Sequence, residues 1–279
     1  MKIRIWPCLI LGFGILTSDV VPRAAANVLV GVTFSGANSV LYSLNPATGA
    51  ASDPRTTGTN HLVGIAYSSG GTLYGLTNST ASSNPNSLLT VNAQTGATQV
   101  VGSTGLSGVV EGDLGFDSTS GTLYGMYELQ AGQRKLFTMN TATGAATLLP
   151  NSLAGDPSAM AFDVSGTLFV VDTSLQLLST VNKTTGATLS SIALSTALGA
   201  AAGMAFDPTS GLLYVTDGES GGTNRLYTLN TTNGVLTDIG ASGVTNGLSG
   251  LAFIPEPTTA LLLATGMVLG IRSQRPRRH

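Results

Sequence analysis

Few residues of this chain have the types and spacing that catalysis needs. Between residues 27 and 254, His61 is the only histidine, and there is no cysteine. A zinc site built from several histidines is therefore excluded from this region. A Ser-His-Asp triad would have to use His61, which has no nucleophile-elbow motif near it. Paired carboxylates remain an alternative, for example Asp217 with Glu219, although adjacent loop acids are common. We predict no catalytic residues.

Metal ligands are equally scarce. A calcium ion needs six to eight oxygen atoms that converge on one point, and no stretch has the dense D-x-D-x-D-G spacing of a calcium loop. Asp117, Asp163 and Asp207 each follow a phenylalanine in a repeated motif, so we interpret them as turn formers. We predict no metal site and no cofactor, with one Ca²⁺ held by a ring of acids around a channel as the alternative.

The elements that would position any site come from internal repeats. One unit reads Leu-aromatic-Thr-apolar-Asn-x-x-Thr-Gly-Ala-x-Thr, and its glycines are spaced 47, 48, 42 and 48 residues apart. A second unit, Gly-x-Ala-Phe-Asp-x-x-Ser-Gly-x-Leu-Tyr, lies between these copies and is clearest at residues 112–124 and 203–214. Repetition at this period predicts a repeat architecture.

Each unit predicts a hairpin. The Leu-Tyr-Thr-Leu-Asn segment alternates with period two, as a half-buried strand does. Its Asn starts a turn through the side chain, and the glycine four residues later supplies the positive φ that the turn needs. The Phe-Asp-x-x-Ser-Gly segment joins the other pair of strands in the same way. Four strands in about 45 residues is the pattern of a propeller blade.

The order of these motifs resembles NHL- and YVTN-type propellers, in which a Phe-Asp-Pro turn precedes a Leu-Tyr-Val-Thr-Asp strand, as at residues 206–217. The resemblance implies an all-β propeller. Residues 27–33 look like a second strand without a first, and residues 249–254 look like a first strand without a second. Pairing them closes a five-bladed ring and removes the exposed sheet edges. An open β-solenoid of the same repeats is the alternative.

Such a ring sorts its loops onto two faces. Both tight turns of each blade lie on one face, while the loops between second and third strands and the long connectors between blades lie on the other. The repeats vary most on this second face, and binding residues favour variable loops on rigid scaffolds. We therefore expect a ligand near four acidic residues of that face: Glu128, Asp172, Asp217 and Glu219.

Charge excludes one class of partner. Residues 27–254 hold five basic and twelve acidic side chains, a net charge of −7. Binding to nucleic acid needs clustered Lys and Arg to neutralise phosphates, so we exclude nucleic acid as a partner. Charged residues are 9% of the chain, against about 25% in typical globular domains. Thr, Ser, Asn and Gly replace them, as in many exported β proteins.

The N-terminal end has the pattern of a signal peptide. Residues 1–4 form a short basic segment with Lys2 and Arg4, residues 5–16 are mostly apolar, and an A-x-A site with Ala24 and Ala26 precedes Asn27. We assign residues 1–26 to the signal peptide and residues 27–254 to the exported propeller.

The C-terminal end, residues 255–279, combines a short proline motif, an apolar run over 258–271 and a basic end. A run of 14 residues is shorter than the roughly 20 that span a bilayer, and the arginines would hold its end on the cytoplasmic side. A helix packed on the domain is the alternative, but the run lacks polar positions at helical spacing.

This tail resembles the PEP-CTERM sorting signal of Gram-negative bacteria. The resemblance implies processing by the membrane protease exosortase during export, after transient insertion of the tail into the inner membrane. It assigns the signal to Pro255, Glu256, Pro257, Arg272, Arg275, Arg277 and Arg278.

Taken together, these features predict an exported, non-enzymatic propeller at the cell surface or in the extracellular matrix of a Gram-negative bacterium. The expected partners are an exosortase-type enzyme and an extracellular polysaccharide or surface protein. The alternative is a propeller hydrolase, lactonase or lyase acting on an extracellular carbohydrate, which would need convergent acids and a metal on the variable face.

Overall fold

A computed structural model describes residues 27–130, 133–218 and 224–255. Within these ranges the chain forms twenty β-strands and no helix, so no described segment could cross a membrane as a helix. The predicted signal peptide, with Ala24 and Ala26, lies outside the described residues. So does the sorting tail after Pro255.

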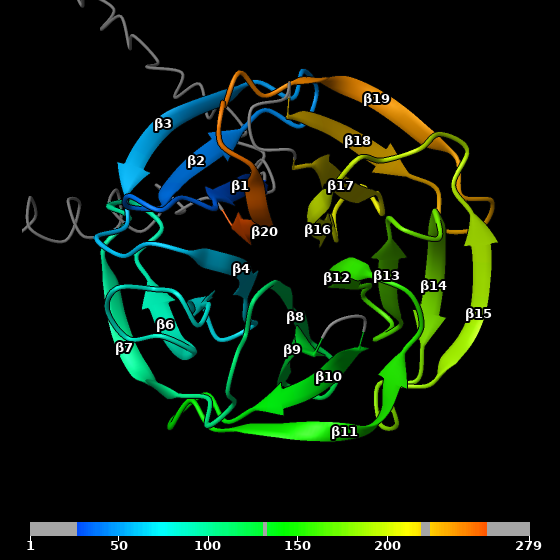
Figure 1. Ribbon diagram of the computed structural model, residues 1–279. Coiled ribbons are helices and arrows are strands. Elements are labelled where there is room, and N and C mark those ends of the chain that lie inside the picture. Colours follow the sequence, from blue (N-terminus) through cyan, green and yellow to red (C-terminus); the bar gives the residue numbers. More distant parts are fainter. Residues whose placement is uncertain (1–26, 131–132, 219–223, 256–279) are drawn as a thin grey trace, which may run out of the picture.

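The strands form five four-stranded antiparallel sheets arranged in a ring around one axis (Figure 1). Blade 1 contains β20 (Leu248–Pro255), β1 (Asn27–Thr33), β2 (Val40–Leu44) and β3 (Ala51–Thr56). Blade 2 contains β4 (Leu62–Tyr67), β5 (Leu73–Thr77), β6 (Ser87–Val91) and β7 (Thr98–Ser103). Blade 3 contains β8 (Gly112–Asp117), β9 (Thr122–Gln130), β10 (Gln133–Met139) and β11 (Ala146–Leu153). Blade 4 contains β12 (Pro157–Phe162), β13 (Leu168–Asp172), β14 (Leu177–Val181) and β15 (Thr188–Ala193). Blade 5 contains β16 (Ala201–Phe206), β17 (Leu213–Asp217), β18 (Arg225–Leu229) and β19 (Leu236–Ala241).

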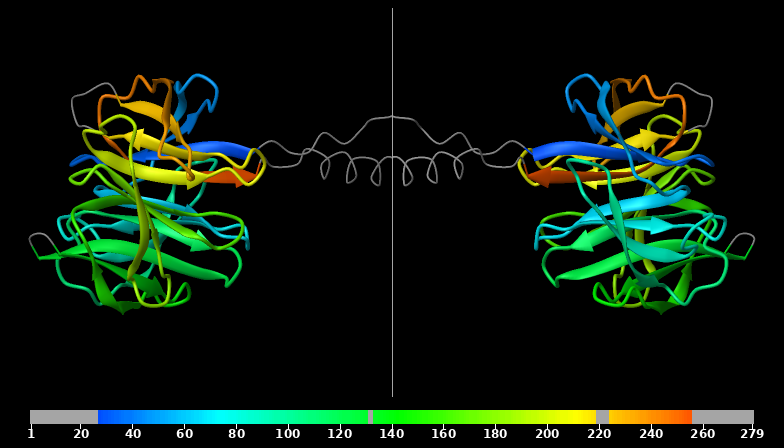
Figure 2. Two further views of the ribbon diagram at one scale, coloured as in Figure 1. Left: turned by 90° about the vertical axis from the view of Figure 1, so that its right-hand side faces the viewer. Right: turned by 90° about the vertical axis from the view of Figure 1, so that its left-hand side faces the viewer.

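The predicted five-bladed propeller is confirmed, and the ring closes where the two ends of the domain meet. β1 pairs antiparallel with β20, with Val30 opposite Ala252 and Asn27 opposite Pro255. The two strands lie side by side in Figure 2. β20 therefore extends one residue into the predicted tail. The sheet of blade 1 therefore contains strands from both ends of the domain. The ring is closed, and the open solenoid is not formed.

The turns that join third and fourth strands form as their motif predicts. In each blade the Asn side-chain oxygen accepts a hydrogen bond from the N–H two residues later, at 2.8–3.0 Å. The glycine four residues after it has a φ of +72° to +80°, a conformation that costs glycine little. The asparagines are Asn45, Asn92, Asn140, Asn182 and Asn230.

The hydrophobic core lies between neighbouring blades rather than at one centre. Ala159 and Val171 of blade 4, for example, form one cluster with Met204 and Val215 of blade 5. The outermost strands are mostly exposed, with only a few partly buried positions, as in β15. This exposure explains their Thr and Ser content, because these residues fit a solvated strand surface.

The innermost strands approach one another closely around the axis. A Cβ atom added to Gly64 would lie 2.7 Å from the Cα of Asp113, and one added to Gly203 would lie 2.7 Å from the Cα of Gly250. Glycine is needed at these positions because any larger side chain would meet the backbone of the next blade.

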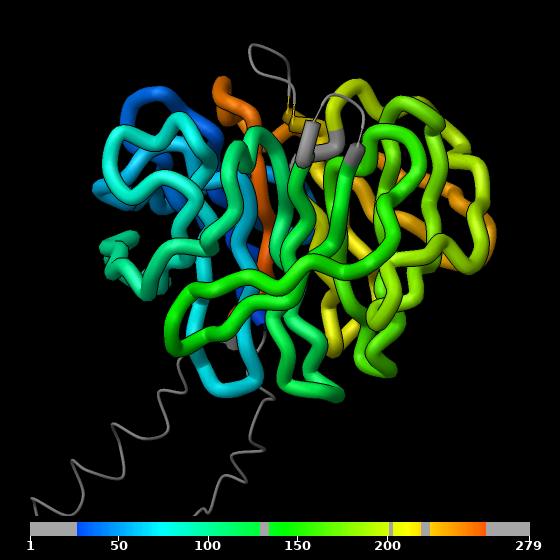
Figure 3. The backbone as a smooth tube through the Cα atoms, turned by 60° about the horizontal axis from the view of Figure 1, so that its bottom comes forward, coloured from blue at the N-terminus to red at the C-terminus, as the bar shows by residue number. Residues whose placement is uncertain are grey.

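Two faces of the ring can now be defined. The turn face carries the short turns after the innermost strands, the Asn turns, the start of β1 and the end of β20. The loop face carries the loops between second and third strands and the connectors between blades. Figure 3 shows the ring from its side, with the turn face at the bottom.

Candidate functional site

A cavity of about 340 Å³ opens on the turn face, at the axis of the ring. Each innermost strand contributes three consecutive residues to its wall, so the repeated x-Ala-Phe sequence gives three stacked rings of residues. Successive side chains of a strand point to opposite faces, so Ile65 and Tyr67 pack into one interblade cluster and Ala66 into another. The deepest ring contains Ile65, Leu114, Met160, Met204 and Leu251. The middle ring contains Ala66, Gly115, Ala161, Ala205 and Ala252. The ring at the mouth contains Tyr67, Phe116, Phe162, Phe206 and Phe253. We call this cavity the axial pocket.

The aromatic ring at the mouth is held by neighbouring blades. Phe162 packs against Tyr124 of β9, with ring centroids 5.0 Å apart. Phe253 packs edge-on against Tyr214 of β17, with centroids 5.4 Å apart. Aromatic pairs at these distances stabilise the interface beyond the area that they bury. The mouth of the axial pocket is therefore fixed by the same contacts that hold the blades together.

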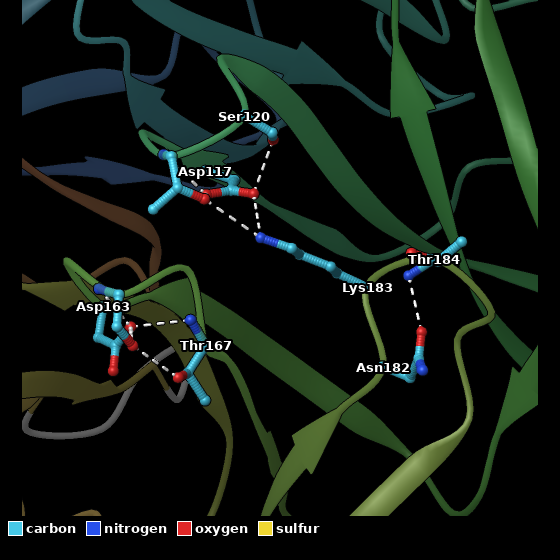
Figure 4. Close-up of polar contacts among 9 residues, drawn as sticks. Asp117, Ser120, Asp163, Thr167, Asn182, Lys183 and Thr184 are labelled. Carbon is cyan, nitrogen blue, oxygen red and sulfur yellow. Dashed lines mark hydrogen bonds and ion pairs between the residues drawn. The ribbon is translucent and has the colours of Figure 1, made fainter.

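Beside the mouth, Asp117 is neutralised by a lysine (Figure 4). Its Oδ2 accepts a hydrogen bond from the ammonium group of Lys183 at 2.5 Å. Burial opposes ionisation of Asp117, but hydrogen bonds from Lys183, Thr119 and Ser120 outweigh it and hold the pKa of Asp117 well below its usual value. This ion pair joins the first turn of blade 3 to the Asn turn of blade 4.

The equivalent acids of the next two blades have no such partner. Asp163 lines the axial pocket and accepts the backbone N–H groups of Ser165 and Thr167 at 2.9 and 2.8 Å. Asp207 accepts the amide of Asn27 at 3.2 Å. Burial would raise the pKa of Asp207, but hydrogen bonds lower it. Within the part of the chain that the structure describes, neither acid forms a salt bridge. The interpretation of these acids as turn formers agrees with their hydrogen bonds.

A buried carboxyl group lies on the axis behind the axial pocket. Asp113 is 0% exposed. Its two oxygens accept the N–H groups of Leu114 at 2.8 Å and Met160 at 2.9 Å. Burial raises the pKa of Asp113 well above its usual value, against hydrogen bonds from Met160, Leu114 and Met204. Asp113 thus connects the innermost strands of blades 3, 4 and 5.

Sequence reasoning missed Asp113, although a signal was present. Counting back three residues from the aromatic residue at the mouth in each blade places Asp113 at the position that is Gly64, Gly203 or Gly250 in three other blades. Ala159 occupies it in blade 4. One acid in a ring of small residues is the feature that would have identified it.

Three of the four acids predicted to surround a ligand are described, and they lie on the loop face. Asp172 is 4% exposed, and its Oδ1 accepts the N–H groups of Ser174 and Leu175, both at 2.8 Å. The carboxylate of Asp217 accepts the N–H of Ala200 at 3.2 Å. Glu219 lies outside the described residues. Asp172 and Asp217 therefore order the loops of blades 4 and 5 through hydrogen bonds to backbone N–H groups.

Glu128, the fourth predicted acid, belongs to a cluster around a buried arginine. Arg134 is 2% exposed and lies 2.7 Å from Glu111 and 3.9 Å from Glu128. Its Nε donates to Asp156 at 2.8 Å. Burial would lower the pKa of Arg134, but the acids raise it. Arg134, which sequence reasoning did not single out, holds together three segments of the loop face. Among the described residues, no three His, Cys, Asp or Glu side chains are placed to share a metal ion.

His61, the one candidate for a triad, also lies on the loop face. Its ring stacks on Phe34 with centroids 4.9 Å apart, and its Nδ1 is 3.0 Å from the hydroxyl of Thr80. The axial pocket is a separate cavity, and none of Glu128, Asp172, Asp217 and His61 lines it. Its apolar walls can enclose an apolar group, and its rim acid can attract positive charge.

Comparisons with known proteins place the chain in a family without an assigned activity. No curated protein matches the chain. A protein of unknown function from Bacteroides caccae is similar in structure, with a TM-score of 0.53, 15% identity, and coverage of 83% of this chain and 100% of that one. A chain in a nidogen/laminin complex is similar with a TM-score of 0.51 and 14% identity, and the match covers 82% of this chain and 98% of that one. A chain from a structure titled for the de novo evolutionary emergence of a symmetrical protein has a TM-score of 0.52 and 19% identity. That match covers 82% of this chain and 100% of the other.

At these identities the likeness shows the fold alone. The family model of a repeat of unknown function, DUF6923, matches residues 112–255, which include blades 3, 4 and 5 and strand β20. The chain belongs to the DUF6923 repeat family.

Proposed function

We propose that this protein is an exported, non-enzymatic binding platform. It is sorted to the cell surface or extracellular matrix of a Gram-negative bacterium by exosortase-type processing of its C-terminal tail. The observation that carries the proposal is the pairing of Asn27 with Pro255 at the edge of blade 1. The predicted signal peptide ends at residue 26 and the predicted tail begins at residue 255, so both segments join the closed ring at its border. The twenty strands all lie between Asn27 and Pro255, so removing residues 1–26 or the tail after Pro255 leaves the five sheets intact.

The same pairing orients the ring during sorting. Because β1 starts and β20 ends on the turn face, a tail inserted in the inner membrane would hold that face toward the bilayer. The loop face, with its variable connectors, would point away from the membrane. A polysaccharide or surface protein would then reach the loop face even while the tail is still inserted.

The rigidity of the ring supports the binding role. The blades are joined by interblade clusters, by the Asp117–Lys183 ion pair and by the β1–β20 closure. Binding to a scaffold that is already ordered costs little conformational entropy. A closed propeller therefore presents its axial pocket and its loops in fixed positions.

Replacement of Pro255-Glu256-Pro257 by three alanines tests the sorting. We expect the unprocessed chain to accumulate in a host that has exosortase, as a band of higher mass on a gel, while the wild-type chain is processed. Proline has no N–H, so alanine at residue 255 removes no hydrogen bond of β20, and thermal unfolding should be unchanged. The control is the wild-type chain in a host without exosortase. Normal processing of the triple-alanine chain would refute the proposed sorting.

A further inference from the structure

We propose that the axial pocket binds a small organic cation with apolar substituents, of the trialkylammonium class. The inference rests on the binding role proposed above and is independent of the proposed sorting.

The shape of the axial pocket suits one compact group that enters from the turn face. Its volume of about 340 Å³ is at the lower end of small-molecule sites, which are roughly 300–1,000 Å³. The far side is closed, because the innermost strands of neighbouring blades meet around Gly64, Gly250 and the buried Asp113. A ligand can therefore enter the pocket but cannot pass through the ring.

The mouth of the axial pocket has the chemistry of an aromatic cage. Each blade contributes one aromatic side chain to it, and the faces of such rings carry negative electrostatic potential that attracts cations. One member of this ring already lies near a cation: the ammonium nitrogen of Lys183 is 6.0 Å from the ring centre of Phe162. Because neighbouring blades fix Phe162 and Phe253, little rotamer freedom is lost when a ligand binds.

Charge at the mouth favours a cation over an anion. Asp163 lines the pocket, and no lysine or arginine is among the lining residues. Lys183, whose ammonium nitrogen lies near the Phe162 ring, is held by Asp117. Apolar walls around a charge of one sign concentrate its field. Asn27 also lines the pocket, and its side-chain amide donates to Asp207. An α-ammonium group left by cleavage before Asn27 would offset the charge of Asp207, so the negative charge at the mouth is assigned to Asp163.

The inner walls separate this ligand class from a neutral sugar. Sugar hydroxyls need hydrogen-bonding partners when they leave water, because an unpaired buried hydroxyl is costly. The side chains of the two deeper rings are all apolar or glycine, so the polar groups left there are backbone groups at the free edges of the innermost strands. The methyl groups of a trialkylammonium ion need no such partners, so the ion matches both the walls and the charge at the mouth.

Binding of choline and of its neutral carbon isostere, 3,3-dimethylbutan-1-ol, tests the proposal. Both probes are titrated into the full chain by calorimetry, at millimolar concentrations. We expect choline to bind at least about fivefold more tightly, since a cation over aromatic rings gains roughly 1 kcal/mol or more. Phe206→Leu, which keeps an apolar side chain but removes one ring of the mouth, should weaken choline severalfold and change the isostere little.

Two further variants make the result specific. Asp163→Asn keeps an oxygen for the N–H groups of Ser165 and Thr167, so the turn should fold, and choline binding should weaken. Phe34→Leu removes an exposed aromatic ring from the loop face, and choline binding should be unchanged. Equal affinity for the two probes would overturn the cation assignment, as would tighter binding of a neutral monosaccharide. Choline binding of unchanged affinity in both Phe206→Leu and Asp163→Asn would overturn the assignment of the binding site to the axial pocket. Neither outcome alters tail processing, which is measured in cells.

Discussion

The buried carboxyl group of Asp113 should give the propeller a pH dependence opposite to that of most carboxylates. Burial raises the pKa of Asp113 well above the ordinary value, which is about 3.9. Between these two values the folded protein holds a proton that the unfolded chain has lost. The free energy of unfolding should therefore fall as pH rises through that window, by up to about 1.4 kcal/mol per pH unit for one group.

Asp113→Asn removes this titration at nearly constant shape. The amide cannot accept a hydrogen bond on both of its terminal atoms, so one N–H group, of Leu114 or Met160, loses its acceptor. An unsatisfied buried donor costs about 1–3 kcal/mol, and this cost is independent of pH. The variant should therefore have a lower free energy of unfolding than wild type near pH 4. The difference should shrink as pH rises, because only the wild-type protein loses stability.

Urea unfolding of both proteins at intervals from pH 4 to pH 8 measures the effect. The expected result is a difference in unfolding free energy that changes with pH above about pH 4 by up to about 1.4 kcal/mol per unit. Asp113→Ala is the control for the hydrogen bonds, because it should have the same pH slope as Asp113→Asn with a different constant offset. Parallel pH profiles for wild type and both variants would refute the reasoning, since they would mean that the N–H donors offset burial completely.

Three other predictions concern the ring. Deleting residues 27–33 should abolish cooperative thermal unfolding measured by circular dichroism, because β20 loses its partner; a sharp transition would contradict ring closure. Asp117→Asn should cost about 1–3 kcal/mol at pH 7 through lost hydrogen bonds. The lowered pKa of Asp117 means that this contribution is present above the ordinary carboxyl value and declines as pH falls below about 4, so a variant that stays equally weaker down to pH 2 would argue against it. Gly203→Ala should lower the melting temperature, since its Cβ would lie 2.7 Å from the Cα of Gly250 and overpacking typically costs about 1–3 kcal/mol; an unchanged melting temperature would show that the inner strands can separate.

Much of the fold could be predicted because it depends on local signals that recur in every blade. An Asn with a glycine four residues later determines a turn by side-chain hydrogen bonding and backbone conformation alone. Strand alternation then identifies the two unpaired ends, and their pairing, with Val30 opposite Ala252, follows from the need to cover both edges. None of these steps requires a distance between remote residues.

The polar network was harder to predict because its members are far apart in the sequence. Arg134 is one of five basic residues in the propeller, and its partners Glu111 and Asp156 lie 23 and 22 residues away. The Asp117–Lys183 pair spans 66 residues. Contacts of this kind depend on how neighbouring blades are rotated about the axis, which the repeat period does not specify.

The axial pocket was missed for a different reason, which bears on how sites in repeat proteins should be sought. Variation between repeats identifies a site that one or two loops build, and that criterion led to the loop face. A site on the axis takes the equivalent residue from every blade, so its signal is a residue type that recurs in all five repeats. Here that residue is the aromatic one near the end of each innermost strand, from Tyr67 to Phe253. A recurring aromatic residue is also expected from packing alone, and Phe162 and Phe253 do contact the preceding blades. What distinguishes the two roles is the break in the pattern. Packing alone does not require an acid at Asp113, and it does not account for Asp163, which forms no salt bridge with any residue that the structure describes.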